Sequence, residues 1–75
     1  MKSLYTQRQA LLRSILREAR IAAGITQQQL CKRLKRNRNF VSAIERGSHR
    51  LDAVELIEYC EALGLDPQDV LGQIR

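Results

Sequence analysis

The chain has 75 residues, which places it near the small end of what folds alone as one domain. Its apolar fraction of 44% beside 28% charged residues is typical of a globular domain and excludes a disordered chain. No apolar run approaches the roughly 20 residues of a membrane span, and residues 1–9 lack the apolar stretch of a signal peptide. We therefore predict a cytoplasmic protein without membrane contact.

The net charge of +5 hides an uneven distribution along the chain. Residues 1–50 hold twelve Lys and Arg against two acids, for a formal charge of +10, whereas residues 51–75 hold one Arg against six acids, for −5. A basic front and an acidic back favour binding of a polyanion such as nucleic acid on one side. The alternative is a solvated surface whose charges are merely uneven.

The first predicted helix begins near Thr6, which forms a capping box with Gln9. Its apolar residues recur every three to four positions and define a face that looks at the core: Leu12, Ile15, Leu16 and Ala19. The opposite side carries Arg13, Arg17 and Arg20. Gly24 ends this helix.

Residues 26–47 predict two short helices joined by a tight turn. Thr26 caps the first helix, with Gln29 completing a capping box, and its apolar positions are Leu30, Cys31 and Leu34. Asn37 is the N-cap candidate of the second helix, whose apolar stripe is Phe40, Val41 and Ile44, and Gly47 ends it. Two helices this short must cross steeply to share one core, which is the geometry of a helix-turn-helix.

The acidic last third predicts two more helices. A fourth helix begins at the cap formed by Asp52 and Glu55, and its expected buried face is Leu56, Ile57, Cys60 and Leu63. Asp66 and Pro67 begin the last helix, with Val70, Leu71 and Ile74 on its apolar side. No strand pattern is found, so the predicted fold is all-α, with five helices in a single domain over residues 1–75.

Neither metal nor catalytic chemistry is indicated. Cys31 and Cys60 lie on apolar faces and are interpreted as small core residues, and His49 adds too little for a recognised zinc spacing. There is no paired catalytic acid, no nucleophile beside a base and no glycine-rich phosphate loop. We predict no metal, no cofactor and no enzymatic activity.

The stretch 26–47 resembles the helix-turn-helix of the λ-repressor/Cro-like (XRE-type) regulators, and the flanking helices extend the resemblance over nearly the whole chain. The matching positions are Thr26-Gln27, Leu30, Cys31, Arg33, Leu34, Asn37, Arg38-Asn39-Phe40, Val41-Ser42, Ile44 and Glu45-Arg46-Gly47. Lys35 stands where most members have glycine, and Arg36 where many have an apolar residue. The resemblance implies a λ-repressor-like DNA-binding domain.

In such a domain the second helix of the motif enters the major groove by its N-terminal residues. We expect this helix to start near Arg38, with Arg38 and Asn39 reading guanine and adenine edges and Ser42 and Ala43 reaching the same groove. The resemblance implies that Gln27 braces this helix or contacts the backbone. Expected phosphate contacts are Lys35, Arg36, Arg46 and Arg50, whereas Glu45 is interpreted as the partner of a nearby arginine and His49 as simply solvated.

The predicted function is a sequence-specific double-stranded DNA-binding transcriptional regulator, a repressor of bacterial or phage type acting at the nucleoid. A domain of this size makes few contacts to one half-site, so we expect a homodimer on a palindromic operator, with the last helix as candidate contact. No small-molecule effector is implied. The alternative is an antitoxin or a protein-interaction module with the same fold.

Overall fold

The computed structural model describes residues 2–75, with side chains from residue 7 onwards. In this part of the chain all regular structure is helical, which confirms the all-α, five-helix prediction. The helices are α1 (Lys2–Ala22), α2 (Gln27–Leu34), α3 (Phe40–Arg46), α4 (Ala53–Ala62) and α5 (Pro67–Ile74). No described helix combines the length and the apolar character needed to cross a membrane.

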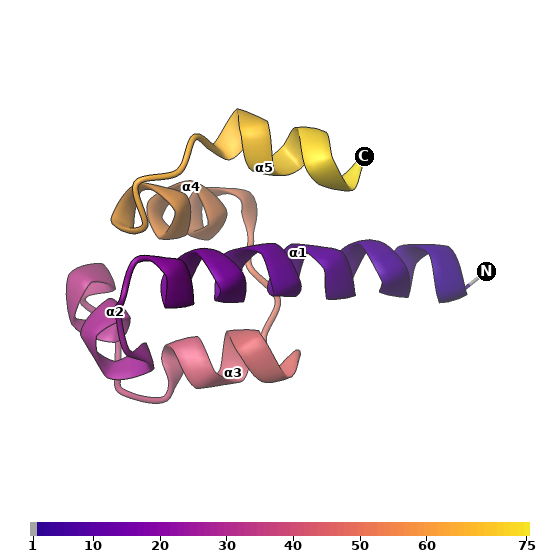
Figure 1. Cartoon of the computed structure of the whole chain (residues 1–75). Coiled ribbons are helices and arrows are strands. Elements are labelled where there is room, and N and C mark those ends of the chain that lie inside the picture. Colours follow the sequence, from indigo (N-terminus) through magenta and orange to yellow (C-terminus); the bar gives the residue numbers. More distant parts are fainter. Residues whose placement is uncertain (1) are drawn as a thin grey trace.

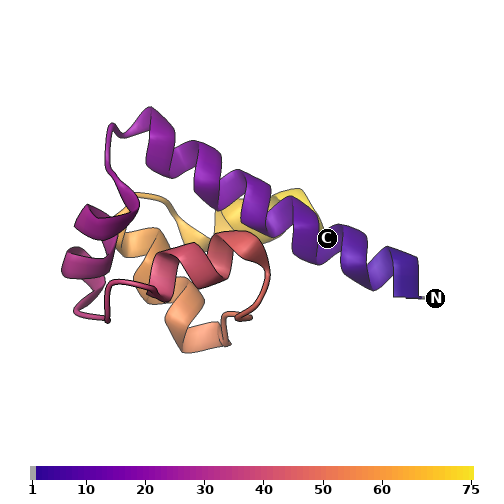
Figure 2. The same ribbon diagram turned by 90° about the horizontal axis from the view of Figure 1, so that it is seen from below.

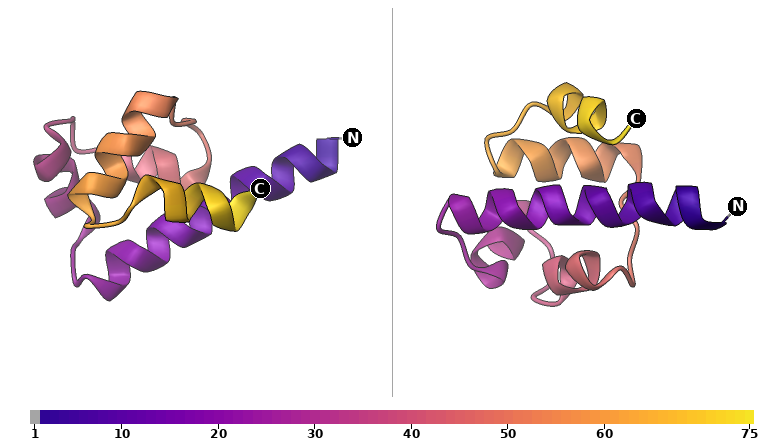
Figure 3. Two further views of the ribbon diagram at one scale, coloured as in Figure 1. Left: turned by 90° about the horizontal axis from the view of Figure 1, so that it is seen from above. Right: turned by 45° about the vertical axis from the view of Figure 1, so that its right-hand side comes forward.

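The long α1 helix divides the molecule into two sides. Helices α4 and α5 lie on one side of α1, and α2 and α3 on the other (Figure 1), an arrangement also visible in the right panel of Figure 3. The N-terminal turns of α1 extend beyond the other helices (Figure 2). Helix α2 contacts both α3 and α4 and so closes the molecule at one end. The helix-turn-helix thus has α1 as its support on one face.

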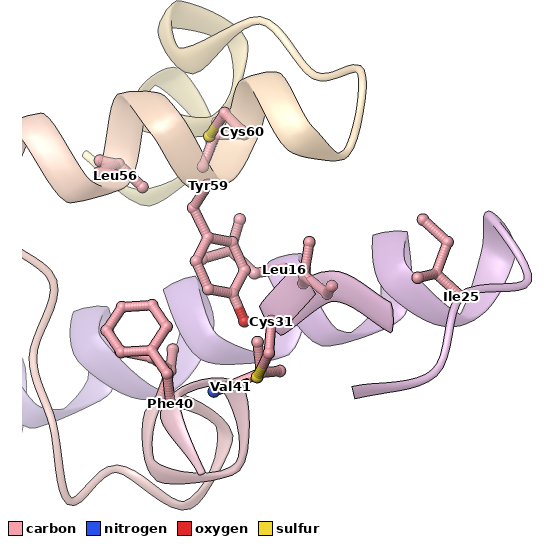
Figure 4. Close-up of a cluster of buried hydrophobic side chains, with 11 residues drawn as sticks. Leu16, Ile25, Cys31, Phe40, Val41, Leu56, Tyr59 and Cys60 are labelled. Carbon is pink, nitrogen blue, oxygen red and sulfur yellow. Dashed lines mark hydrogen bonds between the residues drawn. The ribbon is translucent and has the colours of Figure 1, made fainter. Parts of the chain in front are cut away.

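The core lies where these helices meet, and every helix contributes to it. Its members are Leu16, Ile25, Leu30, Cys31, Phe40, Val41, Ile44, Leu56, Tyr59, Cys60 and Val70. Cys31 and Cys60 are buried free thiols, which confirms their interpretation as core residues, and burial raises the pKa of the Cys60 thiol. Figure 4 shows Tyr59 reaching from α4 across the core toward Cys31.

One predicted core position, in α4, proves wrong. Ile57 is 45% exposed, and Tyr59, which is fully buried, takes its place on the inner face of α4. The buried residues Leu56, Tyr59 and Cys60 follow the helical spacing of three and four, so Ile57 is turned away from them. In α5 Val70 is buried, while Leu71 is 46% exposed and does not pack in the core.

The predicted helix caps are largely confirmed. Thr26 Oγ1 accepts a bond from the Gln29 N–H at 3.1 Å, and Gln29 Oε1 accepts one from the Thr26 N–H at 2.9 Å. Asp52 and Glu55 form the same reciprocal box at the start of α4, and Asp66 caps α5 ahead of Pro67.

The predicted start of α1 is wrong. The helix begins at Lys2 instead of near Thr6, because residues 2–5 include neither glycine nor proline and the helical hydrogen bonding continues through them. Thr6 therefore lies inside the helix, and the predicted bond of its side chain to Gln9 lies outside the described side chains.

Lys35 has the left-handed backbone that its place at a glycine position predicts. Its φ of 57° and ψ of 43° make it the only described non-glycine residue with positive φ. The Lys35 N–H bonds to the Lys32 carbonyl at 3.1 Å, and the Arg36 N–H bonds to the Cys31 carbonyl at 3.0 Å. This is the pairing that ends a helix in a left-handed residue, so the turn keeps the geometry of the glycine it replaces, at a cost in strain.

Lys35→Gly should therefore stabilise the protein by about 1 kcal/mol, because glycine adopts this conformation without the Cβ penalty. For a domain of this size that is a rise in melting temperature of roughly 4–8 °C. Lys32→Gly is the matched control, since it removes the same exposed side chain from the interior of α2, and it should destabilise by about 1 kcal/mol. Thermal unfolding followed by circular dichroism measures both, and a lower melting temperature for Lys35→Gly would contradict the strain at this residue.

Candidate nucleic-acid interface

The turn ahead of α3 differs from the prediction. Asn37 Oδ1 accepts a bond from the Asn39 N–H at 2.9 Å, and the Asn37 carbonyl accepts one from the Phe40 N–H at 3.1 Å. An asparagine side chain that bonds the backbone two residues on forms an Asx turn, which competes with helical pairing. The regular helix therefore begins at Phe40, with Asn39 as its N-cap, instead of near Arg38.

Arg38 and Asn39 consequently sit in the turn that leads into α3, at its N-terminal end. Both residues are exposed, and neither side chain has a hydrogen-bond or ion-pair partner among the described residues. Ser42 and Ala43, one turn further along, are half-buried. Ser42 Oγ already accepts a bond from Arg46 at 2.7 Å. Of the four predicted base-reading residues, Arg38 and Asn39 are thus exposed without side-chain partners, whereas Ser42 and Ala43 are half-buried.

A nearly buried ion pair connects α3 to α1. Arg20 Nε donates to Glu45 Oε2 at 2.7 Å and Arg20 Nη2 to Glu45 Oε1 at 3.2 Å, so the guanidinium meets the carboxylate with two bonds. Only 11% of the Arg20 side chain and 7% of the Glu45 side chain are exposed. Arg20 was expected on the solvated side of its helix, and the structure instead turns it inward against Glu45.

The same carboxylate also connects α3 to α2. Gln27 Nε2 donates to Glu45 Oε1 at 2.9 Å, and Arg20 Nη1 donates to the Ile25 carbonyl at 2.8 Å. Glu45 therefore bonds the end of α1 and the first residue of α2, while Arg20 also bonds the connection between these two helices. We call Arg20, Gln27 and Glu45 the brace, because together they fix the position of α3 against its two neighbours.

Arg36 occupies a different environment from the open one predicted for it. Its guanidinium carbon lies 4.1 Å from the centre of the Phe40 ring, and Nη2 bonds Glu55 Oε2 at 3.0 Å. A cation over an aromatic face and a charge-assisted bond both hold the side chain against the body of the protein. Arg36 is thus already engaged where a DNA contact was expected, although 38% of its side chain remains exposed.

The prediction that His49 is merely solvated is wrong. Its ring packs edge-on against Phe40, with 5.3 Å between ring centres, and Nε2 lies 3.4 Å from Glu55 Oε1. The Asp52 backbone N–H lowers the pKa of the Glu55 carboxyl, and bonds from Arg36 and His49 lower it further, against the opposing effect of burial. These contacts connect the turn before α3, the loop after it and the start of α4.

The remaining predicted backbone contacts, Lys35, Arg46 and Arg50, are all exposed. Arg46 bonds two hydroxyls, Ser42 Oγ at 2.7 Å and Ser48 Oγ at 3.3 Å, and has no carboxylate partner among the described residues. Arg13 of α1 was not predicted as a site residue, yet it shares a cleft with Arg46 and Arg50. Its sequence separation of more than thirty residues from both gives no local signal that could have placed it there.

The described residues include no cluster of three or more His, Cys, Asp or Glu that could hold a metal ion. Cys31 has a structural use, because its Sγ accepts the backbone N–H of Val41 in the first turn of α3 at 3.5 Å. The thiol therefore contributes to the junction between α2 and α3.

This geometry defines the class of the protein: a five-helix domain with a helix-turn-helix whose second helix is fixed by a brace. A family model described as a helix-turn-helix domain matches residues 11–71. An XRE-family like protein from Pseudomonas syringae pv. tomato str. DC3000 is 41% identical, with a TM-score of 0.92 over 97% of this chain and 89% of that one. The chain therefore belongs to the XRE-type helix-turn-helix family of DNA-binding transcription regulators.

A second solved structure is more distant. The clp gene regulator ClgR from C. glutamicum is 28% identical, with a TM-score of 0.78 over 89% of this chain and 87% of that one. No curated protein matches the chain. Both solved structures thus share the fold over most of the chain.

The brace makes a prediction for stability. Glu45→Gln keeps the shape of the side chain but leaves the Arg20 guanidinium nearly buried without a counter-charge, which should cost about 3 kcal/mol. Glu58→Gln removes the same charge from an exposed position of α4 and should change stability by less than about 0.5 kcal/mol. Urea unfolding measures both.

Adding Arg20→Met to Glu45→Gln should recover part of the loss, since the uncompensated cation is then gone. Equal effects of Glu45→Gln and Glu58→Gln would show that the brace does not stabilise the fold.

Proposed function

We propose that this protein is a sequence-specific regulator of transcription that reads the major groove of double-stranded DNA with α3 and the turn before it. In this proposal Arg38 and Asn39 read base edges, with Ser42 and Ala43 against the groove wall. Lys35, Arg46 and Arg50 hold phosphates, and Gln27 braces α3. The observation that carries the proposal is that Arg38 and Asn39, at the entry to a braced helix, are exposed and unengaged.

The chemistry of these two side chains suits base reading. An arginine donates two parallel bonds to O6 and N7 of guanine, and an asparagine pairs with N6 and N7 of adenine. Specificity requires that these donors are held in a fixed position, because the two parallel bonds to a base form only when the side chain is correctly placed. The brace supplies that fixed position, with its three bonds between 2.7 and 3.2 Å on Glu45.

Arg36 has a smaller part in this proposal than the sequence suggested. Its guanidinium stacks on Phe40 and pairs with Glu55, and this pairing offsets the positive charge that would attract a phosphate. We assign it to positioning the turn, where it holds Phe40 at the start of α3, and expect a weaker phosphate contact than from Lys35 or Arg46.

We further propose that the protein binds as a two-fold dimer on a palindromic operator and acts as a repressor. In α5 Val70 is 2% exposed and belongs to the protein's own core, so it is removed from the candidate contact. Leu71 is 46% exposed and lies in an open groove with Arg8 and Ile74. Half-sites bound by such a dimer would be centred about one helical turn, roughly 34 Å, apart.

A protein-interaction module, such as an antitoxin, is the competing proposal. The observation that favours it is the outer face of α4, where Val54 is 64% and Ile57 45% exposed. Exposed apolar residues beside acidic ones are suited to a protein partner. Val54 and Ile57 lie on α4, away in sequence from the turn that holds Arg38 and Asn39, so a partner at α4 is compatible with DNA at α3.

The experiment that tests the proposal is selection of binding sites from random duplex DNA, followed by a salt titration. A selected sequence with two inverted half-sites is expected. Binding should weaken about 10³-fold between about 50 and 200 mM salt if roughly six phosphates are contacted. A salt-independent affinity, or no duplex binding at all, would leave the interaction module as the function.

Two alanine variants distinguish a residue that reads bases from one that contacts a phosphate, although each variant removes one positive charge. Arg38→Ala should weaken binding to the selected site by about 1–3 kcal/mol and relax preference at one base pair, a G·C pair. Arg46→Ala should weaken all sequences alike and lower the salt slope by about one. Titrations against the selected site and its single-base variants measure both effects, and a changed sequence preference only in Arg46→Ala would place the reading residues elsewhere.

A further inference from the structure

A cleft of about 260 Å³ opens between α1 and the segment that follows α3. Its polar lining comes from both elements: Gln9 and Arg13 on α1, Arg46 at the end of α3, and Gly47, His49 and Arg50 after it. Leucine and isoleucine side chains form its remaining walls. We call it the Arg13 cleft, and it lies apart from the base-reading residues Arg38 and Asn39, which do not line it.

The Arg13 cleft is strongly cationic. Three guanidinium groups line it and no carboxylate does, and a guanidinium keeps its charge at any pH a protein meets. Arg13 is half-buried and has no hydrogen-bond or ion-pair partner among the described residues. His49 of the lining meets Glu55, which is itself paired with Arg36.

Gly47 makes room for the central guanidinium. A Cβ atom at this position would lie 3.1 Å from Arg13 Cζ and 3.3 Å from Arg13 Nε. Arg13 therefore rests against bare backbone, in space that any other residue would fill. Gly47 also has a φ of 85°, so the same residue ends α3 and admits Arg13.

Arg13 is not needed to cap α3. The Ala43 carbonyl already accepts bonds from the Ser48 and His49 N–H groups at 3.0 and 3.3 Å, and the Ile44 carbonyl accepts one from Gly47 at 3.1 Å. The Ala43 and Ile44 carbonyls in the last turn of α3 are thus occupied without Arg13. A half-buried arginine without an acid or carbonyl partner among the described residues has a planar fork of donors available to a ligand.

We propose that the Arg13 cleft is a seat for one phosphate-class oxyanion, held by Arg13 with Arg46 and Arg50. Its volume is below the roughly 300–1,000 Å³ of sites for drug-sized ligands and equals that of about nine liquid waters. It therefore suits a single phosphate group with some hydration. Guanidinium forks match phosphate oxygens with paired, charge-assisted bonds.

The phosphate can come from two sources. One is a phosphate of the DNA backbone beside the reading helix, which rests on the proposed function. The other is a free phosphate or a phosphorylated small molecule. Its binding at Arg46 would compete with DNA, because we assign Arg46 to a contact with the DNA backbone. The seat itself is tested without DNA.

The test titrates the full chain with inorganic phosphate at constant ionic strength, with chloride as the reference anion, and follows backbone and arginine side-chain NMR signals. Saturable shifts are expected at Gly47, His49 and the Arg13 side chain, together with a melting temperature that rises with phosphate. Arg13→Gln should abolish the saturable shifts, while Lys32→Gln, which removes one positive charge from an exposed position of α2 outside the cleft, should keep them. Should Arg13→Gln fail to fold, Arg13→Lys, which keeps the charge but loses the fork, should weaken phosphate binding at least tenfold.

Shifts that never saturate, or that persist unchanged in the folded Arg13 variant, would overturn the proposal. Titrations of the selected duplex identify the source: a DNA phosphate in the seat predicts that Arg13→Gln lowers the salt slope by about one relative to Lys32→Gln. A free anion predicts an unchanged slope in that variant, with phosphate weakening DNA binding of the wild type beyond chloride of equal ionic strength. If the wild type binds no duplex, the proposed function fails while the phosphate titration still decides the seat.

Discussion

The contact of Glu45 with Arg20 and Gln27 is the constraint on which the helix-turn-helix depends. Helix α3 has seven residues, and a helix of two turns is unstable by itself in water. Burial of Phe40, Val41 and Ile44 holds one face of it. Apolar contacts alone would tolerate small rotations, whereas two bonds from Arg20 and one from Gln27 fix where the helix lies. The brace therefore converts a weak helix into a positioned one.

Burying this pair has a cost that the rest of the fold offsets. Removing two charges from water is expensive, and their attraction compensates only when the geometry is good and the remaining donors are satisfied. Here the Arg20 guanidinium also donates to the Ile25 carbonyl, and the second partner of Glu45 is a neutral amide. The pair is thus better understood as a device for orientation than as a large source of stability, which suits the reading role that we propose for α3.

The parts of this structure that the sequence predicts are those that depend on residues close in the chain. The capping boxes at Thr26 and Asp52 involve partners three residues apart, and the left-handed Lys35 follows from the glycine of the resembling family. The predicted start of α3 was wrong because of a local detail: the Asn37 side chain bonds the backbone in an Asx turn. The environments of Arg36 and His49 depend on Glu55, on another helix, so no local pattern could supply them. Helical spacing alone allows either Tyr59 or Ile57 to face the core. The position of α4 against its neighbours determines that Tyr59 is the buried residue.

The same distinction changes how the charge of the chain is understood. The formal charge of +10 on residues 1–50 treats every lysine and arginine as available to DNA. In the structure Arg20 forms an ion pair with Glu45, and Arg36 forms one with Glu55. Arg33 donates to the carbonyl of Ala62 at the end of α4. Arg38, Lys35 and Arg46 remain exposed without a carboxylate partner among the described residues. The number of phosphates that a domain contacts is therefore set by its uncompensated cations, and the paired ones contribute by holding those cations in place.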